Sequence, residues 1–223
     1  MSLYDDASLI AYPSGYKESK IYAQKPVNGT GDLSFTRASS ATRVNSEGLI
    51  ETASVLGSEE VANGDFNNTS WWSVGTYWTI GDGFATRSVV GSQANYSLSR
   101  ASLLTIGKSY EVVISIDSIA SGSVSVILGA TNGDLYTTSG TYTFRGICSS
   151  STTFKISPSG DFNGSVDNVS VKEVITSNIP RIDYSNGCGS LLLEKQSTNL
   201  ITYSEDFSNA AWTKTNVTIS ANS

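Results

Sequence analysis

The chain has 223 residues, 39% hydrophobic and 15% charged, and its 20 Gly and 11 Tyr beside a single Met favour an all-β fold with a core. It contains no histidine, which excludes Ser-His-Asp and Cys-His catalysis, histidine-ligated zinc or haem, and any imidazole general base. Its formal net charge of −6 argues against a nucleic-acid partner, because an acidic surface repels phosphates.

Residues 1–57 show no strong periodicity. The sequence begins with acidic residues where a signal peptide carries Lys or Arg, and no apolar run approaches the ~18 residues of a membrane span. We therefore expect synthesis in the cytoplasm and no membrane partner. Arg37 and Arg43 flank a Ser/Thr-rich run, which could bind an anion or pair with acidic residues of a neighbouring subunit.

From about Trp78 to Val174, the chain repeats short runs that alternate between apolar and polar positions. Along Ser109–Ile116, the side chains of Tyr110, Val112, Ile114 and Ile116 share one face, which predicts a strand with one side in the core. Similar runs cut by Gly-containing turns bring the total to about eight strands, enough for a two-sheet jelly-roll sandwich. The other predicted strands are Thr76–Ile80, Phe84–Val90, Ala94–Ser99, Ser123–Ala130, Gly140–Arg145, Thr152–Ser157 and Ser165–Val174.

Residues 177–203 return to the irregular texture of the first 57. Neither flank has enough apolar residues for a core, so residues 1–57 and 177–203 are predicted to form one discontinuous assembly unit stabilised by a partner chain. The two cysteines, Cys148 and Cys188, are far apart in sequence and are expected to be free thiols, with a disulfide as the alternative.

A short motif occurs twice. Asn63–Trp71 and Ser204–Trp212 share the pattern x-x-Asp-Phe-x-Asn-x-x-Trp, and a strand-like Thr/Val/Ile segment follows each. The second copy ends the sequence. Residues 204–223 are therefore expected to be the start of a second, truncated copy or a terminal cap.

Motifs in both flanks match a known pattern. Gly31–Ser39, Arg43–Glu51 and Pro180–Tyr184 resemble the N-terminal region of a widespread group of tailed-phage virion proteins, and Leu191–Leu200 looks like the continuation of the same pattern. In many relatives the second of these motifs runs almost directly into the third. By this resemblance, residues 58–176 are a domain inserted in a surface loop, a position that tolerates insertion.

The insert has an opening and a closing motif of its own. Its opening, Asn63–Phe66 followed by Trp71 or Trp72, and its closing stretch, Phe162–Val174, are similar to the two ends of carbohydrate-binding-module-like, galactose-binding-like jelly rolls. The fold expected from pattern and resemblance together is all-β, a jelly-roll sandwich inserted into a small irregular β-rich anchoring unit.

The resemblance implies a non-enzymatic structural protein of the virion, a head or tail fibre or decoration component made in the host bacterial cytoplasm. Its flanks would anchor it to other virion proteins, with a homo-oligomer expected. Its insert would bind surface glycans for adhesion to host or mucosal carbohydrate. Two alternatives remain open: a purely structural spacer or assembly protein with no ligand, and a bacterial glycan-binding protein outside any virus.

Aromatic residues near the start of the insert are candidates for glycan binding, because sugar rings present a flat face of C–H groups on which aromatic rings stack. The candidates are Trp71, Trp72 and Tyr77. Trp71 and Trp72 are adjacent in a polar loop, so at most one can easily point inward. Trp78 is predicted to be a core strand residue. Weaker candidates are Tyr96 and Tyr136.

Two carboxylates suggest a structural Ca²⁺. Asp65 and Asp167 would lie close together if the first and last strands of the jelly roll pair, and carboxylates with backbone carbonyls suit this ion. The alternative is turn chemistry, in which Asp bonds nearby backbone. Asn67 stands where the resembled family often has an acidic residue, which weakens the metal assignment.

Paired carboxylates can hydrolyse glycosides without histidine. The adjacent pairs Asp5/Asp6 and Glu59/Glu60 lie in polar segments with no aromatic cleft nearby in sequence. We interpret them as solvated charge and expect no enzymatic activity.

Overall fold

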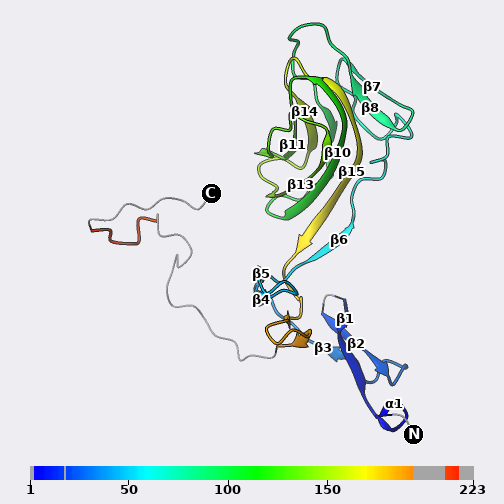
Figure 1. Cartoon of the computed structure of the whole chain (residues 1–223), viewed down its shortest axis with the longest axis vertical. Coiled ribbons are helices and arrows are strands. Elements are labelled where there is room, and N and C mark those ends of the chain that lie inside the picture. The colour runs from blue at the N-terminus through cyan, green and yellow to red at the C-terminus, as the bar shows by residue number, and fades with distance from the viewer. Residues whose placement is uncertain (1–2, 18, 193–208, 216–223) are drawn as a thin grey trace. The chain divides into compact units, whose positions relative to one another are not determined.

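The computed structural model describes residues 3–17, 19–192 and 209–215, and its chain is nearly all β-structure, as predicted (Figure 1). Two compact units, 1–191 and 192–223, are distinguished. In the second, the described turn closes with a hydrogen bond from the Trp212 N–H to the Asn209 carbonyl. Most of the second motif copy, residues 204–223, lies outside the described residues.

Two antiparallel sheets form a sandwich in the first unit. The larger sheet has the order β13 (Gly140–Ile147), β10 (Ser109–Ser121), β15 (Asn163–Ile175), β8 (Phe84–Arg87), β7 (Trp78–Gly81), and β6 (Val55–Glu59) also pairs with β15. The smaller sheet has the order β12 (Thr131–Asn132), β11 (Val124–Leu128), β14 (Phe154–Pro158), β9 (Leu98–Arg100). Every strand predicted for the insert is present.

The core lies between these sheets. Val112 and Ile114 of β10 are at most 1% exposed and belong to one buried cluster with Val126 and Ile156 of the smaller sheet. The predicted alternation along β10 is thus confirmed. Each fully buried aliphatic side chain of this kind contributes about 1.5–3 kcal/mol to folding.

Strand β10 runs past its apolar pattern. Its ladder with β15 continues through Ser118↔Ser165 to Ser121↔Asn163, so backbone pairing extends the strand where side-chain periodicity has ended. Strand β9 is instead shorter than its predicted range, because it begins at Leu98 and not at Ala94. The backbone of residues 94–97 bonds outside the sheets instead, for example from the Tyr96 N–H to the Ala94 carbonyl (2.9 Å).

A tight hairpin joins β7 to β8. Asp82 and Gly83 have φ angles of 54° and 82°, the left-handed pair that a two-residue hairpin turn requires. The hairpin pairs Trp78 with Arg87, so Tyr77, which precedes β7, lies beside the end of β8.

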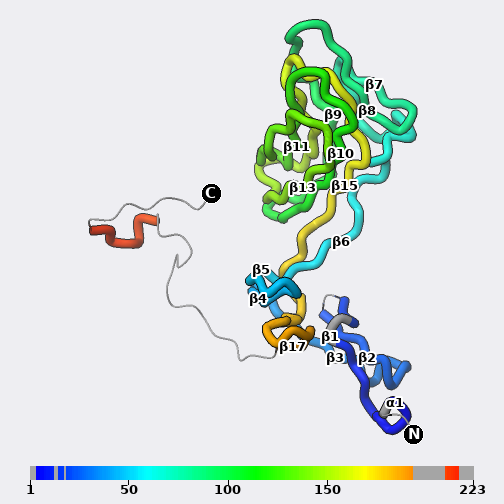
Figure 2. Tube along the Cα trace, in the orientation of Figure 1, coloured from blue at the N-terminus to red at the C-terminus, as the bar shows by residue number. Residues whose placement is uncertain are grey.

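Strand β6, which the sequence pattern did not predict, pairs with the last strand of the sandwich. Strand β6 runs beside β15 (Figure 2) and antiparallel to it, with Glu59 opposite Lys172 in the register. Further along, the Val169 N–H donates to the Gly64 carbonyl (2.9 Å). Strand β6 crosses the boundary predicted after residue 57, and the division into an anchoring unit and an insert stays a prediction.

The flanks form small sheets. The Val44 N–H donates to the Asp183 carboxylate (3.0 Å) and the Tyr184 N–H to the Val44 carbonyl (3.0 Å), so segments far apart in sequence contact each other. Arg43 pairs with Glu51 of the same chain (2.9 Å). The elements are α1 (Leu3–Asp6), β1 (Ile10–Lys17), β2 (Lys20–Lys25), β3 (Leu33–Ser34), β4 (Thr42–Val44), β5 (Ile50–Thr52), β16 (Ile182–Asp183) and β17 (Ser190–Leu191).

Two further expectations concern cysteine and membrane. Cys148 and Cys188 are free thiols, the first buried and the second exposed, as predicted. Among the residues that the structure describes, no helix is long and apolar enough to cross a membrane.

Candidate functional site

Trp72 is a core residue. It is 5% exposed, its indole N–H donates to the Asn63 carbonyl (2.9 Å), and its ring stacks on that of the fully buried Phe66 with centroids 5.4 Å apart. Trp72, a glycan-binding candidate from the sequence, is therefore kept in the core by its hydrogen bond to a buried carbonyl and by its stacking on Phe66. Of the first copy of the repeated motif, Phe66 belongs to the buried core, and Trp71 is partly buried and packs against it.

Trp71 is half-buried and has a cation over its ring. The Arg100 guanidinium lies 4.9 Å from the ring centroid and donates to the Trp71 carbonyl (2.7 Å). Trp71 also meets Trp72 edge-on, with centroids 4.7 Å apart. As expected of this adjacent pair, one tryptophan points inward, and the other has one ring face covered by arginine.

Tyr77 is exposed and paired with a second tyrosine. Its side chain is 42% exposed and that of Tyr96 is 47% exposed, with ring centroids 6.4 Å apart and planes tilted by 49°. The Tyr77 hydroxyl donates to Oε1 of Gln93 (2.9 Å). We call Tyr77, Gln93 and Tyr96 the tyrosine surface. Tyr77 has a φ of 74°, a backbone conformation that costs energy for a bulky residue and recurs at ligand sites.

The tyrosine surface is fixed from below. The buried Trp78 donates its indole N–H to the Tyr96 carbonyl (2.7 Å), so the predicted core role of this residue is confirmed. The Gln93 N–H donates to the Gly160 carbonyl and its side-chain amide to the Val90 carbonyl (3.0 Å). The backbone groups of this loop, which have no partners in the sheets, thus form hydrogen bonds with other loops and with side chains.

Arg87 is the largest fully buried side chain in the sandwich, with 0% exposure. It donates to the carbonyls of Ala94, Ser159, Gly160 and Phe162, and its guanidinium lies 5.8 Å from the centroid of the Tyr77 ring. Burial lowers the pKa of this guanidinium, and the nearby Tyr77 and Asp161 oppose that shift. Arg87 thereby joins the loop 88–97 to the turn 159–162 beneath the tyrosine surface.

Sequence reasoning missed Arg87 and Gln93. For Arg87 a signal existed, because it has the same strand parity as Ala85, which faces the core. An arginine at an inward position needs several acceptors, and the loop carbonyls provide them. For Gln93 no pattern marks the residue, since its role depends on where two loops meet.

Asp65 and Asp167 bond their own neighbours. Asn67 donates its side-chain amide to Asp65, and Asn168 donates backbone and side-chain N–H groups to Asp167. Within the described ranges, no group of three or more His, Cys, Asp or Glu residues gathers. Since Ca²⁺ takes about six to eight oxygens, these two carboxylates do not by themselves fit the ion, and their contacts follow the turn alternative.

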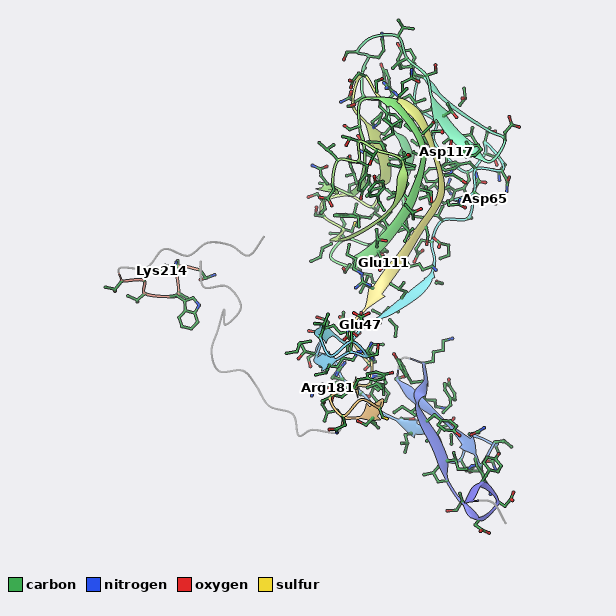
Figure 3. The ribbon with its side chains drawn as sticks, in the orientation of Figure 1. Glu47, Asp65, Glu111, Asp117, Arg181 and Lys214 are labelled. Atoms are coloured by element: carbon green, nitrogen blue, oxygen red, sulfur yellow. The ribbon has the colours of Figure 1, made fainter. Side chains whose placement is uncertain are left out.

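The outer face of the larger sheet is polar. Glu111 of β10, labelled in Figure 3, pairs with Arg145 of β13 (2.7 Å). Lys172 of β15 lies 4.0 Å from Glu59. Glu59, predicted to be solvated, also accepts the Val171 N–H (2.7 Å). On this outer face, the residues paired across β13, β10 and β15 include no aromatic ring on which a sugar could stack. They are Glu111, Val113, Ser115, Thr141, Thr143, Arg145, Ser170 and Lys172.

No known family model matches the chain, and no curated protein matches it. Among solved structures, it is similar to the enzymatically active domain of tailspike protein 4 of bacteriophage CBA120, with 16% identity and a TM-score of 0.36. That match covers 52% of this chain and 21% of the tailspike structure, so the chain spans about a fifth of that relative.

Two carbohydrate-binding modules are also similar. A structure described as CBM4 is 15% identical, with a TM-score of 0.34, and the match covers 51% of this chain and 99% of that one. The CBM1 module of BiXyn10A is 17% identical, with a TM-score of 0.32, and the match covers 63% of this chain and 98% of that one. Each of these three matches leaves more than a third of this chain uncovered.

Proposed function

We propose that this chain is a non-enzymatic structural protein of a phage virion that displays a glycan-binding β-sandwich. The tyrosine surface carries the glycan-binding part, because it holds two exposed aromatic rings side by side on loops with fixed backbone. The virion part rests on the flank motifs that resemble tailed-phage proteins.

Exposed rings of this kind suit a sugar. Pyranose C–H groups stack on an aromatic face while neighbouring polar groups bond the hydroxyls. Trp78 and Arg87 already hold the backbone of these loops in place, so sugar binding has less conformational entropy to overcome. A small contact area can then be enough for binding. The polar outer face of the larger sheet supplies no comparable platform.

Two observations support the non-enzymatic part. The sequence has no histidine, and Glu59, a member of one acidic pair, is engaged by the backbone of β15. Catalysis by paired carboxylates needs one acid and one base facing each other across a substrate. The contacts of Glu59 serve the pairing of β6 with β15.

A glycan array tests this proposal. The full chain is coated on fluorescent beads, because a shallow site of one or two rings binds at roughly millimolar to micromolar strength and needs many copies for retention. Retention on a defined set of glycans is expected. Uncoated beads and beads coated with heat-denatured chain are the controls, and no retention on any glycan would contradict the proposal.

The spacer alternative is favoured by one observation. Of the described side chains in residues 3–34, Ile21 is the one buried, at 3% exposure. A three-stranded sheet with so little core needs packing against something else. Exposed apolar side chains here are Tyr4, Leu9, Tyr12, Tyr22, Val27 and Leu33.

Self-association would cover this sheet and is compatible with glycan binding. Light scattering after size exclusion is expected to give a mass above 23.6 kDa for the full chain at micromolar concentration. A stable monomer would contradict self-association. Oligomers that are retained on no glycan would make the spacer the better account.

A further inference from the structure

The two exposed tyrosines differ from the other aromatic residues of the sandwich loops. Trp72 and Tyr136 are buried, at 5% and 6% exposure, and Trp71 is half-buried with Arg100 over its ring. The Tyr77 ring also has a guanidinium nearby, that of Arg87 at 5.8 Å from its centroid, but the Tyr77 side chain stays exposed. Tyr77 and Tyr96 each keep more than two-fifths of their surface open. A flat ligand therefore finds accessible ring area at this pair.

Hydrogen-bonding capacity remains beside the two rings. The Tyr77 hydroxyl donates to Gln93 and keeps its own lone pairs, and Gln93 uses one of its two amide N–H groups on Val90. No described residue bonds the Tyr96 hydroxyl. Donors and acceptors thus lie next to ring surface, which is the combination that a sugar with its hydroxyl groups requires.

The loops that hold the pair are uncharged. Residues 71–77 and 88–97 contain no Asp, Glu, Lys or Arg. The nearby guanidinium of Arg87 is fully buried and donates to loop carbonyls. An acidic sugar bound here would lose water around its carboxylate or sulfate without gaining a cation, which is costly.

We propose that the tyrosine surface is a subsite for a neutral pyranose ring, which stacks on the tyrosine pair and bonds through its hydroxyl groups to Gln93 and Tyr96. This inference rests on the proposed glycan-binding function and narrows it to three side chains and an uncharged ligand. Trp71 and Trp72 are outside the subsite.

Affinity electrophoresis of the full chain tests the subsite. Native gels contain a neutral polysaccharide (galactan, mannan, xylan or β-glucan) or an acidic one (polygalacturonate, alginate or hyaluronan). Tyr77→Ala and Tyr96→Ala are expected to weaken retardation about tenfold or more in the neutral gel that retards the wild type. Tyr12→Ala is the matched control, because Tyr12 is a similarly exposed tyrosine (55%) of β1.

Each outcome has one meaning. Retardation by a neutral polysaccharide that both tyrosine variants lose, with Tyr12→Ala unchanged, supports the subsite. Retardation that both variants keep overturns the subsite and leaves glycan binding standing. Equal or stronger retardation in acidic gels overturns the neutral class, and no retardation of the wild type in any gel overturns the function itself.

Variant folding is checked separately. Thermal unfolding of each variant is compared with the wild type, and Tyr96→Ala is expected to leave the melting temperature nearly unchanged because its side chain is exposed. If Tyr77→Ala unfolds, Tyr96→Ala and Gln93→Ala decide the result. Retention of binding by both of these folded variants overturns the subsite.

Discussion

The carboxylate of Asp183 accepts a hydrogen bond from the backbone N–H of Val44, 139 residues earlier in the chain, with Oδ1 and N 3.0 Å apart. The Ser185 N–H donates to the same carboxylate, and the Tyr184 N–H returns to the Val44 carbonyl. One side chain thus joins the two flanks that the sandwich separates in sequence.

This carboxylate predicts a pH dependence. The backbone bonds from Val44 and Ser185 lower the pKa of Asp183 below its ordinary value of about 3.9. The hydrogen bonds to the ionised carboxylate therefore stabilise the folded flanks fully at pH values above the ordinary pKa of Asp. This stabilisation is lost as the pH falls through the lowered pKa of Asp183. The Val44 amide signal in NMR is expected to titrate with a midpoint below about 3.9. Asp183→Asn should abolish that titration, whereas Asp134→Asn in an exposed loop should not.

Gly64→Ala is expected to destabilise the sandwich. A Cβ at Gly64 would meet the Val169 carbonyl oxygen at 1.9 Å, so backbone must move, at a cost of about 2–3 kcal/mol. Gly81→Ala is the control, because nothing lies within 4 Å of its added Cβ. Urea unfolding measures both changes, and equal stabilities would contradict the close approach of the two segments.

Replacing either of the two neighbouring tryptophans should destabilise the sandwich by a different amount. Trp72→Ala removes a buried ring that stacks on Phe66 and is expected to cost about 3–5 kcal/mol. Trp71→Ala removes a half-buried ring and should cost less, with glycan retention kept. Calorimetric unfolding of the two variants checks the order, and a larger loss for Trp71→Ala would contradict it.

Arg87→Met is expected to loosen the support of the tyrosine surface. The Phe162 carbonyl would lose its donor, whereas the carbonyls of Ala94, Ser159 and Gly160 each keep a backbone N–H. Because a buried carbonyl left without a donor costs about 1–3 kcal/mol, the variant should lose about that much stability. Hydrogen exchange should quicken in residues 88–97. Arg145→Met is the control, because Arg145 is exposed and its single ion pair contributes at most about 1 kcal/mol. Unchanged exchange in Arg87→Met would show that the loop is held by other contacts.

Periodicity predicted the sandwich well because strand pairing there follows side-chain alternation. Val112 and Ile114 face the core, and the Gly-containing Asp82-Gly83 turn separates two of the predicted strands. Periodicity did not predict strand ends that are set by backbone pairing. An example is β10, whose ladder with β15 continues to Ser121. There the ladder includes a single apolar residue of β10 that packs against the core, Ile119, which lies opposite Gly164.

The candidate site was predictable only in part. Tyr77 was identified from its aromatic neighbourhood, but the sequence could not say which of Trp71 and Trp72 points inward. That choice depends on the Asn63 carbonyl, which lies nine positions before Trp72 and comes within reach through a folded loop. Gln93 and Tyr96 join Tyr77 because two loops meet in space, and no local pattern encodes that meeting.

NMR of the full chain with ¹³C-labelled tyrosine rings tests the central claim most directly. The chain has 11 tyrosines, and Tyr77→Phe and Tyr96→Phe variants assign the two signals of interest, so the other rings serve as internal controls. On titration with the neutral polysaccharide that retards the chain, or with neutral methyl glycosides if none does, the Tyr77 and Tyr96 signals are predicted to shift together and to saturate. Signals that stay fixed at both rings, or shifts confined to other tyrosines, would contradict the account.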